Sequence, residues 1–92
     1  MDELLLSKIR LGIIAELLTA QWIAFSELQR ELGVSQGNLG AHLAKLVAGG
    51  YVDEEKSFVN RRPQTRYRLT PRGRTAFSDH VTQLQTLLKA SS

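Results

Sequence analysis

The sequence contains no cysteine, and it has only two prolines and one tryptophan among its 92 residues. The absence of cysteine excludes disulfides, thiolate metal ligands and thiol nucleophiles. The two histidines, His42 and His80, are 38 positions apart, which gives little support to a metal site within one chain. We therefore expect no metal, no cofactor and a protein suited to the reducing cytoplasm.

Long apolar runs are also missing. The apolar start at residues 4–6 is broken by Ser7, Lys8 and Arg10, so it is neither a signal-peptide core nor a membrane span. We expect no membrane partner. A chain of 92 residues is expected to form one domain, residues 1–92. Because such a domain has a small core, a partner subunit would add stability.

Acidic residues are scarce where basic residues are concentrated. Residues 1–34 carry a net charge of −2, residues 35–75 carry +5, and residues 76–92 are balanced. Six arginines and no acid lie between Asn60 and Arg74, interleaved with Tyr67, Leu69 and Pro71. Such a run is often only a solvated face, but the interleaved apolar residues favour an ordered surface that binds a polyanion.

The first half of the chain predicts a helix, a short strand and a helix-turn-helix pair. Apolar residues follow helical periodicity over residues 3–20, in two groups that would face two packing partners. The apolar run at residues 22–25 is long enough for one strand. In the pair itself, about residues 26–48, Ser26 and Gln29 match a capping box. Gly33 is suited to a left-handed helix end, and three residues separate the two helices.

The second half predicts a β-hairpin with a basic tip and a long helix. The hairpin spans about residues 51–70, with strands at 51–59 and 64–70 and a turn at 60–63. Thr70 is expected to cap the last helix, residues 71–90, with Pro71 at its first position. A narrow apolar stripe at nearly heptad spacing follows in that helix: Phe77, Val81, Leu84 and Leu88.

The predicted order is helix, strand, helix, helix, strand, strand, helix, which is an α+β winged helix-turn-helix. Three stretches resemble small winged-helix transcriptional regulators of the MarR and ArsR groups. They are SQGNLGAHLAKL at residues 35–46, GGYV at 49–52 and RYRLTPRGR at 66–74. The resemblance implies a three-helix core, a hairpin wing and a dimer held by the terminal helices. Glu54 departs from the family pattern, since such wings usually have an apolar residue at that strand position.

The resemblance and the charge pattern together predict a regulator that binds double-stranded DNA at an inverted-repeat operator as a homodimer. The second helix of the pair is expected to enter the major groove, where each base pair has a distinct pattern of donors and acceptors. The wing arginines are expected to reach phosphates or the minor groove. The predicted DNA contacts are Ser35, Gln36, Gly37, Asn38, His42 and Lys45 in the helix, and Arg61, Arg62, Gln64, Thr65 and Arg66 in the wing. Ser35 is equally suited to capping the helix, and His42 to a structural role.

The dimer contact is predicted from the surplus apolar positions of the terminal helices. The candidate residues are Leu4, Leu11, Ile14 and Leu18 in the first helix, and Phe77, Val81, Leu84 and Leu88 in the last. The sequence does not indicate which stripe faces the partner.

Other functions receive less support. Residues 33–37 match the pattern of a hydrolase nucleophile elbow, but a helix precedes the serine and the chain is too short for the required sheet. The chain is therefore not expected to be an enzyme. A winged-helix module that binds structured RNA or another protein remains the alternative. No segment dedicated to sensing a small-molecule effector is evident, although a dimer-interface pocket would offer space for one.

Overall fold

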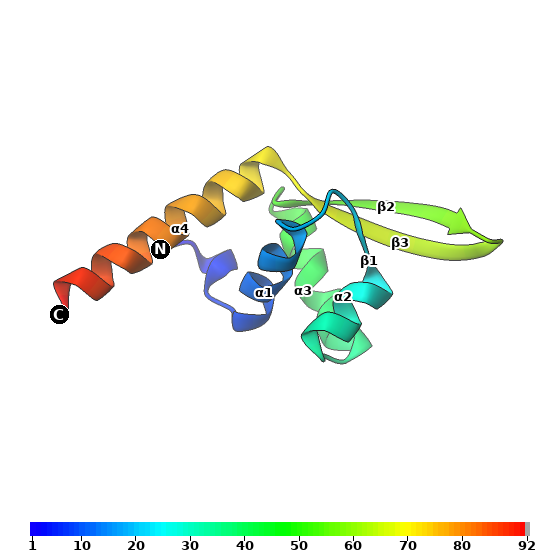
Figure 1. Cartoon of the computed structure of the whole chain (residues 1–92), viewed down its shortest axis with the longest axis horizontal. Coiled ribbons are helices and arrows are strands. Elements are labelled where there is room, and N and C mark those ends of the chain that lie inside the picture. The colour runs from blue at the N-terminus through cyan, green and yellow to red at the C-terminus, as the bar shows by residue number, and fades with distance from the viewer. Residues whose placement is uncertain (92) are drawn as a thin grey trace.

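The computed structural model describes residues 1–91, and residue 92, the last of the predicted domain, lies outside the described residues. The elements of residues 1–91 follow in the predicted order, with one 3₁₀ helix added at the start (Figure 1). They are η1 (Glu3–Leu5), α1 (Lys8–Leu17), β1 (Ile23–Ala24), α2 (Phe25–Leu32), α3 (Gln36–Ala48), β2 (Val52–Val59), β3 (Arg62–Leu69) and α4 (Pro71–Ala90). The predicted α+β winged helix-turn-helix architecture is confirmed.

The wing is a long two-stranded ribbon that belongs to a three-stranded antiparallel sheet of order β1-β3-β2. Its register runs from Val52 opposite Leu69 to Val59 opposite Arg62. Strand β1 pairs with β3 only at Tyr67 and Arg66. Within residues 1–91, the outer part of the wing therefore has no third strand, and it projects from the helical body (Figure 1).

The turn of the wing is shorter than predicted. Asn60 and Arg61 have positive φ angles of 52° and 65°, as the two central residues of a type I′ turn require. Arg62 and Pro63, which we expected in the turn, belong to β3. Proline has no N–H to donate, and it is tolerated at this place because β3 pairs there with β2 alone.

The core lies between the first three α-helices and the base of the wing. Helix α3 contributes its inward face, on which Leu39, Leu43 and Leu46 are at most 1% exposed. The other buried apolar residues are Leu5, Ile13, Ile14, Leu17, Ile23, Leu28, Tyr51, Val52 and Tyr67. The three leucines recur at helical spacing, which fixes the rotation of α3 and turns its opposite face to solvent.

The prediction of a single first helix over residues 3–20 is wrong, because Ser7 interrupts the helical conformation between η1 and α1. Ser7 is extended (φ −114°, ψ 129°), and its hydroxyl accepts a hydrogen bond from the backbone N–H of Arg10 at 3.2 Å. The serine is therefore the N-cap of α1, while Asp2 caps η1 before it. Helical periodicity across residues 3–20 did not distinguish one helix from two.

The capping box predicted at Ser26 and Gln29 is not formed. Helix α2 begins one residue earlier, at Phe25, and its N-cap, Ala24, makes no side-chain capping bond. Ala24 is the last residue of β1, so its pairing with Arg66 sets where the strand stops and the helix starts. Phe25 packs against the core, with its ring centroid 6.5 Å from that of Tyr67. Tertiary packing therefore overrides the local capping signal.

The other predicted helix ends are confirmed. Gly33 has the left-handed conformation (φ 63°) and ends α2, and Ser35 caps α3. The hydroxyl of Thr70 accepts a hydrogen bond from the backbone N–H of Gly73 at 2.9 Å, with Pro71 at the start of α4. These are local backbone requirements that the residue types satisfy by themselves.

Helix α4 and the wing extend from opposite ends of the helical body, which gives the molecule dimensions of 54 × 25 × 21 Å (Figure 1). The N-terminus lies near the middle of α4 (Figure 1). Within residues 1–91, none of the helices is long and apolar enough to span a membrane.

Candidate nucleic-acid interface

The outer face of α3 carries small and hydrogen-bonding side chains. With its leucines in the core, the helix exposes Gln36, Gly37, Asn38, Ala41, Ala44 and Lys45. A methyl group added at Gly37 or Gly40 would have no neighbour within 4 Å. Packing within the chain therefore does not require glycine at these two positions. A helix face of this kind can approach a surface closely while Gln36, Asn38 and Lys45 reach out from it.

The predicted role of Ser35 as a helix cap is confirmed. Its Oγ accepts a hydrogen bond from the backbone N–H of Asn38 at 3.2 Å. The side chain remains exposed at the N-terminus of α3, where the helix dipole favours a negatively charged group.

His42 lies toward α1 instead of at the centre of the outer face. Its Nδ1 is 2.9 Å from Nη1 of Arg10, which also donates from Nε to the backbone oxygen of Leu4 at 2.6 Å. Arginine only donates, so Nδ1 of His42 accepts and the ring is neutral in this contact. Burial, and then the charges of Arg10 and Lys45, lower the pKa of His42 below its ordinary value. The geometry favours the structural reading of His42 over a DNA contact.

The tip of the wing presents uncompensated positive charge. Arg61 and Arg62 are exposed, and among residues 1–91 neither side chain has an ion-pair or hydrogen-bond partner. Lys56 is exposed on the neighbouring strand. Arg61 lies in the two-residue turn and Arg62 follows it as the first residue of β3, so both are at the far end of the ribbon (Figure 1).

Two other arginines of the wing are neutralised, contrary to our expectation that no acid compensates the basic run. Arg66 donates to Oε1 of Glu55 from Nε at 2.9 Å and from Nη2 at 2.5 Å. Arg68 donates from Nε to Oδ2 of Asp53 at 3.0 Å. Both acids lie directly across the ladder from their arginines. Arg66 is therefore removed from the set of free phosphate-binding cations, although it was predicted among them.

Both of these arginines also contact Trp22, the residue before β1. The guanidinium carbons of Arg66 and Arg68 lie 4.3 and 4.7 Å from the centre of its ring. Sequence reasoning did not identify this contact. A two-residue turn at Asn60 and Arg61 sets the strand register, and that register places Asp53 opposite Arg68 and Glu55 opposite Arg66. The position of Trp22 beside the wing depends instead on the fold of the 18–22 loop.

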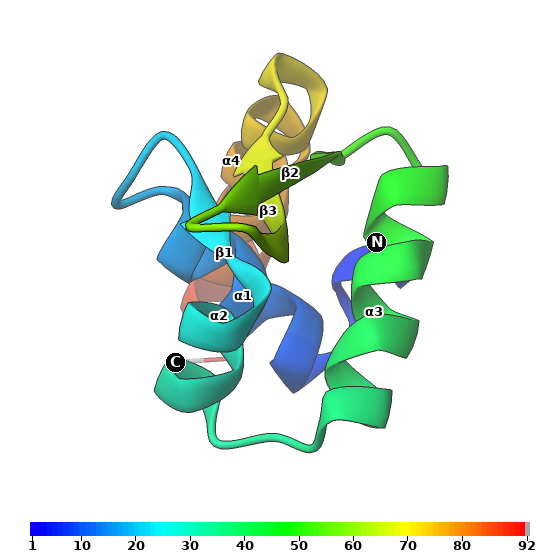
Figure 2. The same cartoon turned by 90° about the vertical axis from the view of Figure 1, so that its right-hand side faces the viewer.

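A groove separates the wing from the N-terminal part of α3. It has a volume of about 540 Å³ and is lined by Phe25, Ser26, Gln36, Gly40, Glu54, Lys56, Pro63, Gln64, Thr65 and Tyr67. Helix α3 lies beside the wing in the view from the wing end (Figure 2). Gln36, Gln64 and Thr65, all predicted DNA contacts, therefore meet at one place, and Glu54 and Lys56 join them.

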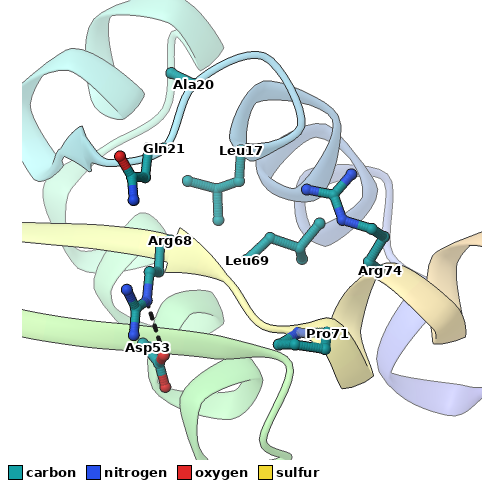
Figure 3. A pocket seen from close by; sticks show the side chains of 8 residues that line it. All are labelled: Leu17, Ala20, Gln21, Asp53, Arg68, Leu69, Pro71 and Arg74. Atoms are coloured by element: carbon teal, nitrogen blue, oxygen red, sulfur yellow. Dashed lines mark hydrogen bonds and ion pairs between the residues drawn. The ribbon is translucent and has the colours of Figure 1, made fainter.

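A second hollow, of about 360 Å³, lies between the end of α1, β3 and the start of α4. Figure 3 shows Arg68 joined to Asp53 at one side of it and Arg74 at the other, with Leu17 and Leu69 between them. The loop after α1 and helix α3 lie on opposite sides of the wing (Figure 2). This hollow is therefore separate from the groove beside α3. Arg72 lines neither of these two hollows, and its guanidinium carbon lies 5.9 Å from the ring centre of Tyr51.

Of the predicted dimer contacts, Ile14 must be corrected. It is 0% exposed within one chain, so it has no surface to offer a partner. Leu4, Leu11 and Phe77 are partly buried against the core of their own chain. Outside the wing, the exposed large apolar residues among residues 1–91 are Met1, Leu6, Leu18, Leu84, Leu87 and Leu88.

The chain packs three helices around a buried core, and a basic hairpin projects from them. The second helix of its helix-turn-helix pair is exposed on one face. These features define a winged helix-turn-helix protein. Comparison with known families agrees with this class. The model of the winged helix DNA-binding domain matches residues 9–88, and the chain belongs to that family.

The chain is similar along nearly its full length to known proteins from several organisms. The uncharacterized protein MJ0432 of Methanocaldococcus jannaschii is 34% identical over 83 residues, which are 90% of each chain. The transcriptional regulator homologue of Pyrococcus horikoshii has a TM-score of 0.83 at 28% identity, over 98% of this chain and 94% of that one. Wild-type MarR of E. coli shares the fold, with a TM-score of 0.70 at 22% identity over 96% and 79% of the two chains. The predicted resemblance to winged-helix transcriptional regulators is confirmed.

Proposed function

We propose that this chain is a transcriptional regulator that binds double-stranded DNA sequence-specifically as a homodimer. One observation carries the proposal: Gln36 on the exposed face of α3 and Lys56, Gln64 and Thr65 of the wing line the same groove. The major groove of DNA admits a helix, and the phosphates on its edge attract arginine. With α3 in the major groove, the tip of the wing would lie along the backbone or in the adjacent minor groove, while the part of the wing beside α3 stays at the major groove.

The side chains of α3 suit base reading in different ways. Gln36 and Asn38 can each form two hydrogen bonds with adenine, and Lys45 can donate to guanine or to a phosphate. Arg61 and Arg62, at the wing tip, are suited to phosphate contacts, which set affinity and register but carry little base information. Binding would therefore combine a specific term from α3 with an unspecific term from the wing.

A homodimer is supported by the apolar surface at the other end of the molecule. Leu84, Leu87 and Leu88, which share one face of α4 at spacings of three and four residues, are 37%, 54% and 70% exposed. Such a cluster on a small monomer typically marks an interaction surface. We place the partner's contact on this set, which shifts it from the predicted stripe toward the end of α4. A two-fold dimer would read an inverted repeat with half-site centres about 10 base pairs apart, or a multiple of that distance.

Base reading by α3 is tested by selecting bound sequences from random duplex DNA and then measuring the affinity of each single-base variant. Gln36→Ala and Asn38→Ala are each expected to relax the preference at one position per half-site, by about 1 to 3 kcal/mol, because a two-bond base contact is lost. All measurements share one salt concentration. Mutant profiles that differ from the wild type only by a uniform offset would exclude base reading by these side chains.

Phosphate binding by the wing is tested by the salt dependence of affinity. The double variant Arg61→Ala, Arg62→Ala is expected to weaken binding to all sequences nearly equally and to lower the log–log salt slope by about 0.9 per lost contact. Arg74→Ala is the matched control, because Arg74 lines the separate hollow of Figure 3. An unchanged slope in the double variant would assign both arginines to a merely solvated surface.

The dimer is tested by sedimentation at micromolar concentration. Leu84→Glu and Leu88→Glu together are expected to give monomers, because charges would replace the apolar contact. Gln85→Glu adds a charge at a neighbouring exposed position of α4 and serves as the control. A wild-type protein that sediments as a monomer would refute the dimer.

The choice of duplex DNA as the partner is tested by competition with duplex RNA. A preference for the RNA would refute that choice.

A further inference from the structure

An acidic side chain lies where the proposed DNA surface is otherwise neutral or basic. Glu54 of β2 is exposed and lines the groove between the wing and α3, together with Gln36, Lys56 and Gln64. Asp53 and Glu55, its neighbours on β2, form ion pairs with wing arginines. Among residues 1–91, Glu54 has no such ion pair. Its negative charge therefore remains available to whatever enters the groove.

The carboxylate is held in place by a buried phenol. Tyr67 lies opposite Glu54 in the strand register, is 4% exposed, and donates its hydroxyl hydrogen to Oε2 of Glu54 at 3.0 Å. Burial first, and then this hydrogen bond, raise the pKa of Tyr67 well above its ordinary value, so the phenol stays protonated and donating at neutral pH. The remaining lone pairs of the carboxylate are left for solvent or for a ligand in the groove.

We propose that Glu54 is a specificity-determining residue, which accepts a hydrogen bond from the exocyclic amine of a cytosine or adenine. DNA sequences that have no such amine at the base facing Glu54 are then bound less tightly. This inference rests on the proposed DNA binding. Phosphates and carbonyl oxygens only accept hydrogen bonds, so a fixed carboxylate repels them. In the major groove, the base atoms that donate are N4 of cytosine and N6 of adenine. The charge of Glu54 thus lowers binding to unmatched DNA and raises the contrast between sequences.

The test is Glu54→Gln, which keeps the size of the side chain and removes its charge. We expect affinity for random duplex DNA to rise about fivefold, the factor that follows from removing one like-charge contact at water-like screening. The ratio of specific to random affinity should fall, and the base-by-base profile should flatten at one cytosine or adenine per half-site. Tyr67→Phe keeps the ring in the core but releases the carboxylate, so it should flatten the same position without changing the net charge.

Asp79→Asn is the charge-matched control, because Asp79 is an exposed acid on α4, which extends away from the wing (Figure 1), and it does not line the groove. An equal change in Glu54→Gln and Asp79→Asn, with unaltered base profiles, would overturn the role of Glu54 and leave DNA binding intact. A wild-type protein that binds no duplex at low salt would overturn both. A flattened position in Glu54→Gln and Tyr67→Phe, absent in Asp79→Asn, supports the inference.

Discussion

Replacing Leu43 with alanine should cost a large part of the stability of this domain. Leu43 is 1% exposed and lies at the centre of the three leucines that attach α3 to the core. Burying a leucine side chain contributes about 1.5 to 3 kcal/mol, and the cavity that truncation leaves adds to the loss. We expect the free energy of unfolding to fall by about 3 to 5 kcal/mol, because close-packed neighbours relax only partly into the space.

Equilibrium unfolding in urea measures this loss, with Trp22 as the reporter. It is the one tryptophan of the sequence, and it contacts Arg66 and Arg68 at the wing base, so its fluorescence should change when the fold is lost. Small domains have urea slopes of about 1 to 3 kcal/mol per molar. The midpoint should therefore fall by about 1 M or more, with the slope itself unchanged.

Leu88→Ala is the matched control, because it makes the same substitution at a position that is 70% exposed. At fixed protein concentration its effect should be much smaller. In the proposed dimer, the loss in Leu88→Ala should vary with protein concentration, since dimer stability follows mass action, whereas the added loss from Leu43→Ala should not. Equal midpoints for Leu43→Ala and the wild type would refute the placement of Leu43 in the core.

Two further outcomes follow from single sites. Burial and the nearby charges lower the pKa of His42 in the folded state, so the unfolded state binds more protons than the folded state as the pH falls through about 6.5. The urea midpoint of the wild type should therefore drop between pH 7 and pH 5. The drop should be smaller in His42→Gln, which has no imidazole to protonate. If both proteins show the same pH dependence, His42 does not govern this titration. Gly73→Ala should unfold at a lower urea concentration, because its new Cβ would overlap the backbone oxygen of Tyr51. In Gly37→Ala the new Cβ meets no atom within 4 Å, so the free energy of unfolding should rise by about 0.5 to 1 kcal/mol. A more stable Gly73→Ala variant in the same titration would contradict that packing.

Sequence reasoning located the parts of the candidate interface but not their electrostatics. Gln36, Asn38 and Lys45 were predicted on the outer face of α3, and the structure exposes all three. Arg66 was predicted as a free cation, but its partner Glu55 is 11 residues away in the chain. A run that lacks acids along the chain need not lack them in space, because a hairpin places a second strand beside it.

The sequence by itself determined the order of elements and most helix ends. Gly33, Ser35 and Thr70 act through the backbone of their own neighbours, and the leucines of α3 recur with the period of the helix, so local physics suffices for both. Tertiary structure alone decided where α2 begins, which way His42 points and which wing arginines are free. These depend on the pairing of β1 with β3, on the approach of Arg10 from α1 and on the register of the wing. Each is a contact between segments distant in the chain, which periodicity and capping signals do not encode.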